Sequence, residues 1–279
     1  MRLSPNLVGE AVSRALDEDI GRGDITTDAL IGADAMSAAR LVAREAGIVA
    51  GLELAEAAFR TLDPAMSFER ALQDGDAVEA GQTLEHIRGH TRALLSGERV
   101  ALNFLTHLSG VATLTSRYVM AVAGTKARIA DTRKTLPGLR LFEKYAVKMG
   151  GGTNHRFGLD DAAMIKDNHL VAAGGIAAAV KKVRANAGHM VRISCEVDRL
   201  DQIEEALSAG ADVLLLDNMV PADLAEAVRR VAGRAVTEAS GGVSLETVAA
   251  IAAAGVDMIS IGRLTHSAPS LDIALDFEI

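Results

Sequence analysis

Cysteine, tryptophan and long apolar segments are scarce or absent in this chain of 279 residues. Cys195 is the only cysteine, so no disulfide can form within the chain, and we expect a reducing cytoplasm. We interpret Cys195 as a buried core thiol rather than a nucleophile. The N-terminus shows no apolar signal core. The apolar segment at 100–122 is interrupted by Asn103, His107 and Arg117, which argues against a membrane span there.

Positive charge is scarce over most of the chain, whose formal net charge is −8. This balance argues against broad nucleic-acid binding but allows a small anionic ligand held by a local basic cluster. Such a cluster lies at 126–169, where nine Lys/Arg against five Asp/Glu give +4. We expect Lys134 and Lys166, at strand ends, to meet an anion. The other helical lysines are expected on solvated helix faces, namely Lys144, Lys148, Lys181 and Lys182.

The first third of the sequence predicts helices mixed with short strands. Ser4-Pro5 is typical of a helix start, and apolar residues follow it at helical spacing. We expect a strand at 37–50, a helix at 51–62 and short strands up to residue 87. Ser96-Gly97-Glu98-Arg99 predicts the start of a long helix. Arg99 would then lie where the helix dipole disfavours a cation, either as a surface residue or as a contact with substrate or partner.

From residue 127 onward, strands alternate with helices. The strands end near Asp131, Lys166, Glu196, Asp217, Glu238 and Gly262, and a helical segment follows most of them. This alternation predicts a parallel sheet in an α/β fold. Successive crossovers of one hand, without a clear reversal, favour a closed or nearly closed barrel over an open sheet. Six units are clear, fewer than the eight of a complete barrel.

Two glycine-rich loops follow the last two strands of this pattern. Ser240-Gly241-Gly242 precedes a helix, and Ser260-Ile261-Gly262 is the next loop. Glycine lets backbone N–H groups approach an anion at a helix N-terminus, and barrels often bind phosphate at these loops. We therefore predict a phosphate site, with an ordinary flexible turn as the alternative.

Two carboxylates, Glu196 and Asp217, end adjacent strands and should be neighbours. They could bind Mg²⁺ or hydrogen-bond sugar hydroxyls, and the alternative is a buried ion pair with a barrel lysine. His155 and His169 could ligate a metal together with Asp160 or Asp161, but the tight spacing of a zinc site is absent. The cationic strand ends then suit a small, highly anionic substrate, such as a phosphorylated sugar meeting a carboxylated partner.

At these positions the sequence resembles the quinolinate phosphoribosyltransferases, also called nicotinate-nucleotide pyrophosphorylases (decarboxylating). The similarity runs from the loop at 18–27 to 265–268, nearly the whole chain. Its motifs are Asp131-Thr-Arg-Lys-Thr135, Pro137-Gly138-Leu139-Arg140, Lys144-Tyr-Ala-Val147, Asn154-His-Arg156, Ile165-Lys-Asp-Asn-His169, Glu196-Val197, Leu216-Asp-Asn218, Glu238-Ala-Ser-Gly-Gly242 and Ile261-Gly262.

The resemblance implies an N-terminal α/β sandwich over 1–110, which makes dimer and substrate contacts. An incomplete, TIM-like parallel α/β barrel of six to seven strands would follow over 111–267, and 268–279 would pack back on the N-terminal domain. It also implies a cytoplasmic homodimer or assembly of dimers, with Arg99 reaching the neighbouring site. The implied reaction is phosphoribosyl transfer from phosphoribosyl pyrophosphate to quinolinate with decarboxylation, in NAD biosynthesis. Its products are nicotinate mononucleotide, pyrophosphate and CO₂, and its cofactor is Mg²⁺.

Residue roles follow from the same resemblance, motif by motif. The catalytic residues would be Lys134, Lys166, Glu196 and Asp217. Quinolinate would be bound by Arg99, Thr132, Arg133, His155, Arg156 and Lys166. Phosphoribosyl pyrophosphate would be bound by Lys134, Glu196, Asp217, Ser240, Gly241, Gly242, Ser260, Ile261 and Gly262. Glu196 and Asp217 would hold Mg²⁺, directly or through water. Arg263 stands where family members more often have a small residue, either as a phosphate contact or facing solvent.

Three alternatives compete with this interpretation. A barrel aldolase would use Lys166 as a Schiff base, but such a lysine must be desolvated, and Arg156, His155 and Asp167 suggest an ionised role. A non-catalytic paralogue that binds a small anion would be favoured by loss of a cation or carboxylate, and all are present. A phosphoribosyltransferase for nicotinate or nicotinamide would need fewer cations, because those bases carry at most one carboxylate.

Overall fold

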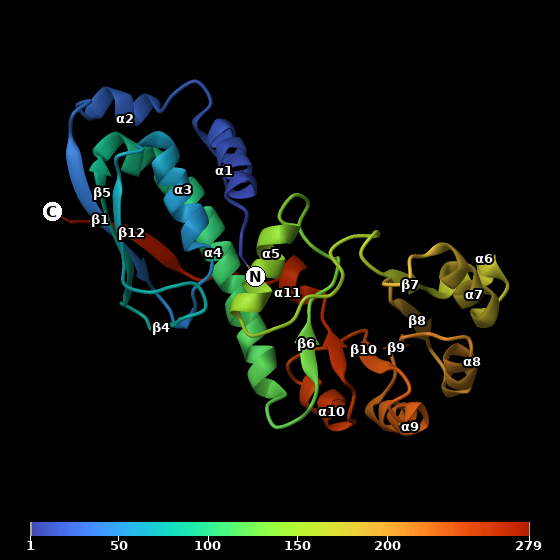
Figure 1. Cartoon of the computed structure of the whole chain (residues 1–279). Helices are drawn as coiled ribbons and strands as arrows, with labels where there is room; N and C mark the ends of the chain where they lie inside the picture. The colour runs from blue at the N-terminus through green and yellow to red at the C-terminus, as the bar shows by residue number, and fades with distance from the viewer. Residues whose placement is uncertain (1, 279) are drawn as a thin grey trace. The chain divides into compact units, whose positions relative to one another are not determined.

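The computed structural model describes residues 2–278, which form two compact units (Figure 1). The first contains the residues up to Ser116, Leu141–Gly151 and the residues from Ser267 onward. The second contains Arg117–Arg140 and Gly152–His266. An antiparallel sheet with helices forms the first unit, and a six-stranded parallel sheet forms the second. The predicted fold class is therefore confirmed, while the exact domain boundaries at 110 and 267 stay a prediction.

The first unit is built on a four-stranded sheet with the order β12-β1-β5-β3. Strand β1 pairs antiparallel with both β5 and the C-terminal strand β12. Helices α1 and α3 pack against each other beside this sheet (Figure 1). The elements are α1 (Pro5–Ile20), α2 (Ile25–Leu30), β1 (Met36–Ala43), β2 (Gly47–Ile48), α3 (Leu52–Leu62), β3 (Ser67–Arg70), β4 (Ala77–Val78), β5 (Thr83–His90) and β12 (Ile273–Glu278).

The long helix α4 spans Thr91–Ala121, so the prediction that it begins at Ser96 is wrong. Gly97 lies inside the helix, where a Cβ atom would come within 3.0 Å of a ring carbon of Phe59. Glycine there permits close packing against α3 and does not mark a helix end. Arg99 lies more than two turns inside the helix and is exposed. The prediction that Arg99 lies in the first turn, where the helix dipole disfavours a cation, is therefore also wrong.

Helix α5 (Arg140–Met149) corrects a second prediction, because Lys144 is fully buried and does not lie on a solvated face. Its neighbour Glu143 is also fully buried, and the Nε2 atom of His107 lies 2.9 Å from a Glu143 carboxylate oxygen. Lys and Glu are rarely buried unless they have partners. This face of α5 therefore belongs to the core of the first unit.

The second unit carries a parallel sheet with the strand order β6-β11-β10-β9-β8-β7. Among the described strands, β6 and β7 pair with one neighbour each, so the barrel is incomplete, as predicted. Helices cover the outside of the sheet (Figure 1). The elements are β6 (Arg128–Ala130), β7 (Ala163–Ile165), α6 (Asp167–Ala173), α7 (Ile176–Asn186), β8 (Ile193–Val197), the 3₁₀ helix Leu200–Gln202, α8 (Ile203–Ser208), β9 (Val213–Asp217), α9 (Pro221–Val231), β10 (Val236–Ser240), α10 (Val248–Ala253), β11 (Met258–Ser260) and α11 (Arg263–His266).

Two further expectations concern the core and the membrane. Cys195 is fully buried in β8, and burial raises the pKa of its thiol to about 11, so it is an inert core residue as predicted. Within residues 2–278, no helix combines the length and apolar character that crossing a membrane requires.

Candidate active site

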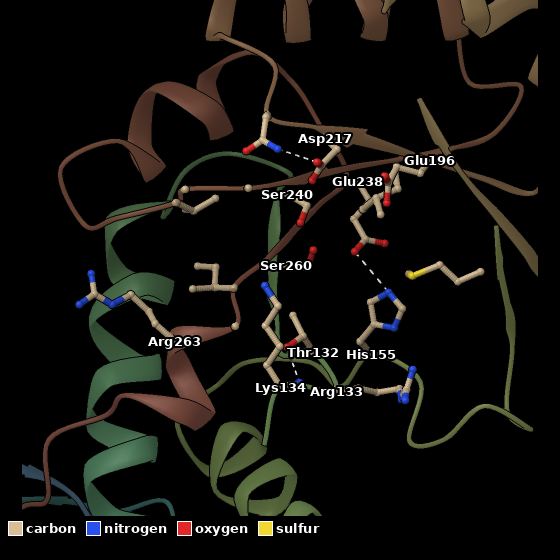
Figure 2. Close-up of a pocket in the computed structure, with 18 of the residues that line it drawn as sticks. Thr132, Arg133, Lys134, His155, Glu196, Asp217, Glu238, Ser240, Ser260 and Arg263 are labelled. Carbon is tan, nitrogen blue, oxygen red and sulfur yellow. Dashed lines mark hydrogen bonds and ion pairs between the residues drawn. The ribbon is translucent and has the colours of Figure 1, made fainter. Parts of the chain in front are cut away.

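A cavity of about 900 Å³ lies at the carboxyl ends of the parallel strands, and the second unit supplies all of its lining (Figure 2). Its size is that of a small-molecule site. The predicted site residues that line it are Thr132, Arg133, Lys134, His155, Arg156, Lys166, Glu196, Asp217, Ser240, Gly241, Gly242, Ser260, Ile261 and Gly262. Of the predicted set, only Arg99, in the first unit, is not among the described residues that line this cavity.

The register of the parallel strands explains why carboxylates converge here. Glu196 on β8 is the partner of Leu215 on β9, which is also the partner of Glu238 on β10. Paired residues of neighbouring strands point to the same face, so these three form one layer inside the barrel. Asp217 is paired with Ser240 in the next layer toward the strand ends. Glu196 and Asp217 therefore lie on adjacent strands, as predicted, in successive layers that both line the cavity.

A buried carboxylate, Asp131, fixes the cationic side of the cavity. Its side chain is fully buried at the end of β6. One oxygen accepts the backbone N–H of His155 at 2.8 Å, and the other accepts a hydrogen bond from the Asn154 amide at 2.6 Å. These contacts hold the loop of His155 and Arg156 against β6. The sequence motifs of both segments thus form a single unit in space.

Two guanidinium groups in this region have no carboxylate partner within 4 Å in the described part of the chain. Arg156 donates to the backbone oxygen of Ala162 at 2.7 Å. Burial and, next, the neighbouring Arg133 lower the pKa of Arg156. The Nε atom of Arg133 is buried and has no hydrogen-bond acceptor among residues 2–278. Two crowded cations with unused donors are the arrangement that an anionic ligand stabilises.

Lys166 and His155, by contrast, each face a carboxylate. The Lys166 ammonium lies 3.6 Å from Glu196, and the Nε2 atom of His155 lies 3.3 Å from Glu238. Glu196 therefore pairs with a barrel lysine, but this is not the buried ion pair of the alternative interpretation. The Lys166 side chain is 53% exposed, so it lacks the desolvation that a Schiff-base lysine requires.

The two glycine-rich loops are tightly fitted to their neighbours. Gly241 has φ +92°, and a Cβ atom there would lie 2.1 Å from the side-chain oxygen of Asn218. At Gly262 a Cβ atom would lie 2.9 Å from the side chain of Lys134. Gly241 thus requires glycine by its positive φ and by this contact, whereas at Gly262 a side chain would displace the flexible Lys134 side chain. The alternative of merely flexible turns does not explain this close fit.

Several lining residues were not on the predicted list, namely Met164, Asp167, Leu215, Asn218, Glu238, Val243, Ser244, Arg263 and His266. Asn218 has φ +55°, and its backbone N–H donates to Ser240 at 2.9 Å, so it shapes the phosphate loop. The Asp-Asn pair after an apolar strand was its signal, because Asn tolerates this conformation. Arg263 lines the cavity, but its guanidinium points away from Lys134 and Ser240 (Figure 2).

The histidine metal site considered from the sequence receives no support. Within residues 2–278 no cluster of three or more His, Cys, Asp or Glu side chains could hold a metal ion. His169 instead accepts the backbone N–H of Lys166 at 2.9 Å and so caps α6.

Comparison with known proteins agrees with this geometry. The family model described as the quinolinate phosphoribosyl transferase C-terminal domain matches residues 111–276, and the model of its N-terminal domain matches 24–109. The chain is 45% identical over 276 residues to the nicotinate-nucleotide pyrophosphorylase [carboxylating] of Mycobacterium leprae, covering 96% of each chain. It is 46% identical over 259 residues to the probable enzyme of that name from Bacillus subtilis, covering 93% of this chain and 89% of the relative.

Solved structures of proteins with this family's fold are also similar to the chain. The crystal structure of NadC from Streptococcus pyogenes superposes with a TM-score of 0.96 at 40% identity, covering 100% of both chains. Sequence, fold and cavity therefore agree, and the chain belongs to the quinolinate phosphoribosyltransferase family of glycosyltransferases.

Proposed function

We propose that this protein transfers phosphoribosyl from phosphoribosyl pyrophosphate to quinolinate and releases pyrophosphate and CO₂, giving nicotinate mononucleotide for NAD biosynthesis. One observation carries the proposal. A single cavity joins a cationic side, with Arg133 and Arg156, to a side with neighbouring carboxylates and two glycine-rich loops. The first side suits a dicarboxylate, and the second suits the ribose and 5′-phosphate of the donor.

The two guanidinium groups without carboxylate partners explain the choice of a dicarboxylate. Planar guanidinium groups bind carboxylates through paired hydrogen bonds, and two of them match the two carboxylates of quinolinate. Nicotinate offers only one carboxylate and would leave one of these half-buried cations without an anionic partner, which is costly. Thr132, His155 and Lys166 complete this side of the cavity. Quinolinate is therefore the better partner for these residues than nicotinate.

Phosphoribosyl transfer forms a bond between the pyridine nitrogen and ribose C1 while the bond from C1 to pyrophosphate breaks. Positive charge develops at C1, and negative charge develops on the leaving group. Glu196 and Asp217 are placed to stabilise the first, and the Lys134 ammonium the second. Lys134 is held by the Thr265 hydroxyl, which donates to its backbone oxygen at 2.7 Å. The 5′-phosphate would lie against Ser240, Gly241, Gly242, Ser260, Ile261 and Gly262.

The site fits a Mg²⁺ ion that takes most of its ligands from the phosphates of the substrate. Glu196 and Asp217 supply the oxygen ligands that Mg²⁺ prefers, but a third protein carboxylate does not join them in any cluster of the described residues. One or two carboxylates plus substrate phosphates are the usual protein site for this ion. When bound, Mg²⁺ neutralises charge on the departing pyrophosphate. Glu196 and Asp217 would hold it, directly or through water.

We extend the proposal to assembly and compartment. Arg99 is exposed on α4, where it could reach the site of a neighbouring subunit in a homodimer or assembly of dimers. That placement would add a further cation to the dicarboxylate side. A cytoplasmic location is consistent with a single, buried cysteine.

An isotope experiment tests the reaction. Quinolinate labelled with ¹³C in the 2-carboxylate is incubated with the protein, and release of labelled CO₂ is measured with and without phosphoribosyl pyrophosphate. We expect release only when the donor and Mg²⁺ are both present, because the ring nitrogen must become cationic before the carboxylate can leave. Release without the donor, or no release at all, would contradict the proposal.

A further inference from the structure

Glu238 is a buried carboxylate in the cavity to which the family resemblance assigned no role. Its residue exposure is only 5%, and it points inward from β10 in one layer with Glu196 and Leu215. Its Oε1 atom is buried and has no hydrogen-bond donor among residues 2–278. Such a group normally costs free energy, so its presence calls for a functional explanation.

The contact between Glu238 and His155 does not satisfy the buried Oε1 atom. The two side chains lie at ion-pair distance, 3.3 Å, but are not aligned as a hydrogen bond. The Nδ1 atom of His155 accepts the backbone N–H of Arg156 at 2.7 Å, so its lone pair is used. A second ring proton on Nδ1 would oppose that N–H. Because Nδ1 accepts this hydrogen bond, His155 can present a ring N–H to Glu238 only through Nε2, the atom that lies 3.3 Å from the carboxylate.

The position of Glu238 lies between the two sides of the cavity. In Figure 2 its carboxylate points down to His155, while Asp217, Ser240 and Glu196 lie above it and Arg133 lies below. The new bond must form where these sides meet, since it joins the pyridine ring to the ribose. Glu238 is therefore placed beside the ring on which positive charge appears.

From this juxtaposition we propose that Glu238 is a further catalytic residue, which stabilises the positive charge acquired by the pyridine ring during phosphoribosyl transfer. The proposal rests on the proposed function and deepens it. Before transfer the ring is neutral and carries two carboxylates, so Glu238 repels the ligand. As the N–C1 bond forms, the ring nitrogen becomes cationic, and the same carboxylate attracts it. An interaction that improves along the reaction lowers the barrier, whereas one that is equal throughout does not.

Glu238 would also favour decarboxylation, because that step depends on the cationic ring nitrogen. The bond between C2 and the carboxylate carbon breaks, CO₂ departs, and the electron pair remains on C2 next to the cationic nitrogen until a proton from solvent replaces the carboxylate. Because Glu238 maintains the cationic ring, it favours the intermediate from which CO₂ leaves.

Two inert dicarboxylates test this proposal without any turnover. Benzene-1,2-dicarboxylate has a neutral ring, and N-methylpyridinium-2,3-dicarboxylate has a cationic ring of similar shape. We expect the wild-type protein to bind the cationic ring about tenfold more tightly in calorimetric titration, and Glu238→Gln to lose this preference. Equal affinity of the wild-type protein for both probes would overturn the proposal, even if no variant folds.

Steady-state kinetics of Glu238 variants provide a second test. Glu238→Gln should lower kcat by about 100-fold, by analogy with the loss of one preorganised electrostatic group. It should leave the dissociation constant of quinolinate unchanged or lower. Glu238→Asp should keep part of the preference, and Glu246→Gln, an exposed glutamate on the same βα segment, should behave like wild type. Equal weakening of both probes would indicate a merely structural role and contradict the proposal. If the wild-type protein makes no nicotinate mononucleotide, the proposed function fails while the probe comparison stays decisive for Glu238.

Discussion

Replacing Gly241 with alanine should damage donor binding through one side chain, that of Asn218. A left-handed φ costs alanine about 1–2 kcal/mol. The new Cβ atom would lie 2.1 Å from the Asn218 oxygen, so Asn218 must move. It then loses the 2.6 Å hydrogen bond that its amide donates to Asp217, which is worth about 1.5–3 kcal/mol for a charged acceptor. We expect a total near 3 kcal/mol, or roughly a hundredfold loss in kcat/KM for phosphoribosyl pyrophosphate.

Gly242 supplies the matched control. Its φ is also positive, +59°, but no atom lies within 4 Å of a Cβ built there. Gly242→Ala should therefore carry only the backbone cost of about 1 kcal/mol, roughly a fivefold loss. Steady-state kinetics with each substrate varied in turn would measure both variants, and the quinolinate dissociation constant should stay unchanged. Equal losses in the two variants would refute the assignment of the effect to Asn218.

Three further predictions concern Lys166, Arg99 and Glu85. Lys166→Ala should fold normally, because its side chain is 53% exposed, yet lose turnover, and full activity in a kinetic assay would remove Lys166 from the mechanism. If subunits share sites, mixing inactive Arg99→Ala and Lys166→Ala subunits should restore about a quarter of wild-type activity, whereas no recovery would argue against an Arg99 contributed in trans. Burial and, next, the Glu56 carboxylate raise the pKa of Glu85 to about 9, so its contribution to stability is lost as pH rises from about 4.5 to 9. Urea unfolding should show that Glu85→Gln is more stable than wild type at pH 8 and that this gain nearly disappears at pH 5, and a gain independent of pH would contradict this.

The alternation of strands and helices in the second unit was readable from the sequence because each strand is a short apolar run that ends in polar residues. Asp217 is the last residue of β9, as predicted, and the helix α9 (Pro221–Val231) follows it. Parallel strands bring such ends to one edge, so the predicted cavity residues could be grouped without knowing any contact. Local pattern and global topology agree here, which is why the prediction succeeded.

Long-range packing was not readable in the same way. Gly97 resembles a helix-start residue, but its role is set by Phe59, 38 positions away in the sequence. Lysine is usually exposed to solvent, so the residue type alone predicts a solvated Lys144. Only the tertiary packing of α5 buries it. In both cases a contact between distant segments overrides the local preference.

Glu238 was recognised as a strand end but not as a site residue, because its importance depends on strand register. A shift by one residue would turn its side chain to the outer face of the sheet. The pairing of Glu238 with Leu215, and of Leu215 with Glu196, fixes the inward direction. Asp131 is a similar case, since its partners Asn154 and His155 lie on a separate segment.

Product analysis by mass spectrometry tests the central claim most directly. The protein is incubated with phosphoribosyl pyrophosphate and Mg²⁺, with quinolinate in one tube and nicotinate in another. The arrangement of Arg133 and Arg156 predicts nicotinate mononucleotide from quinolinate and none from nicotinate. Equal product from nicotinate would contradict the dicarboxylate specificity, and no product in either tube would contradict the proposed reaction.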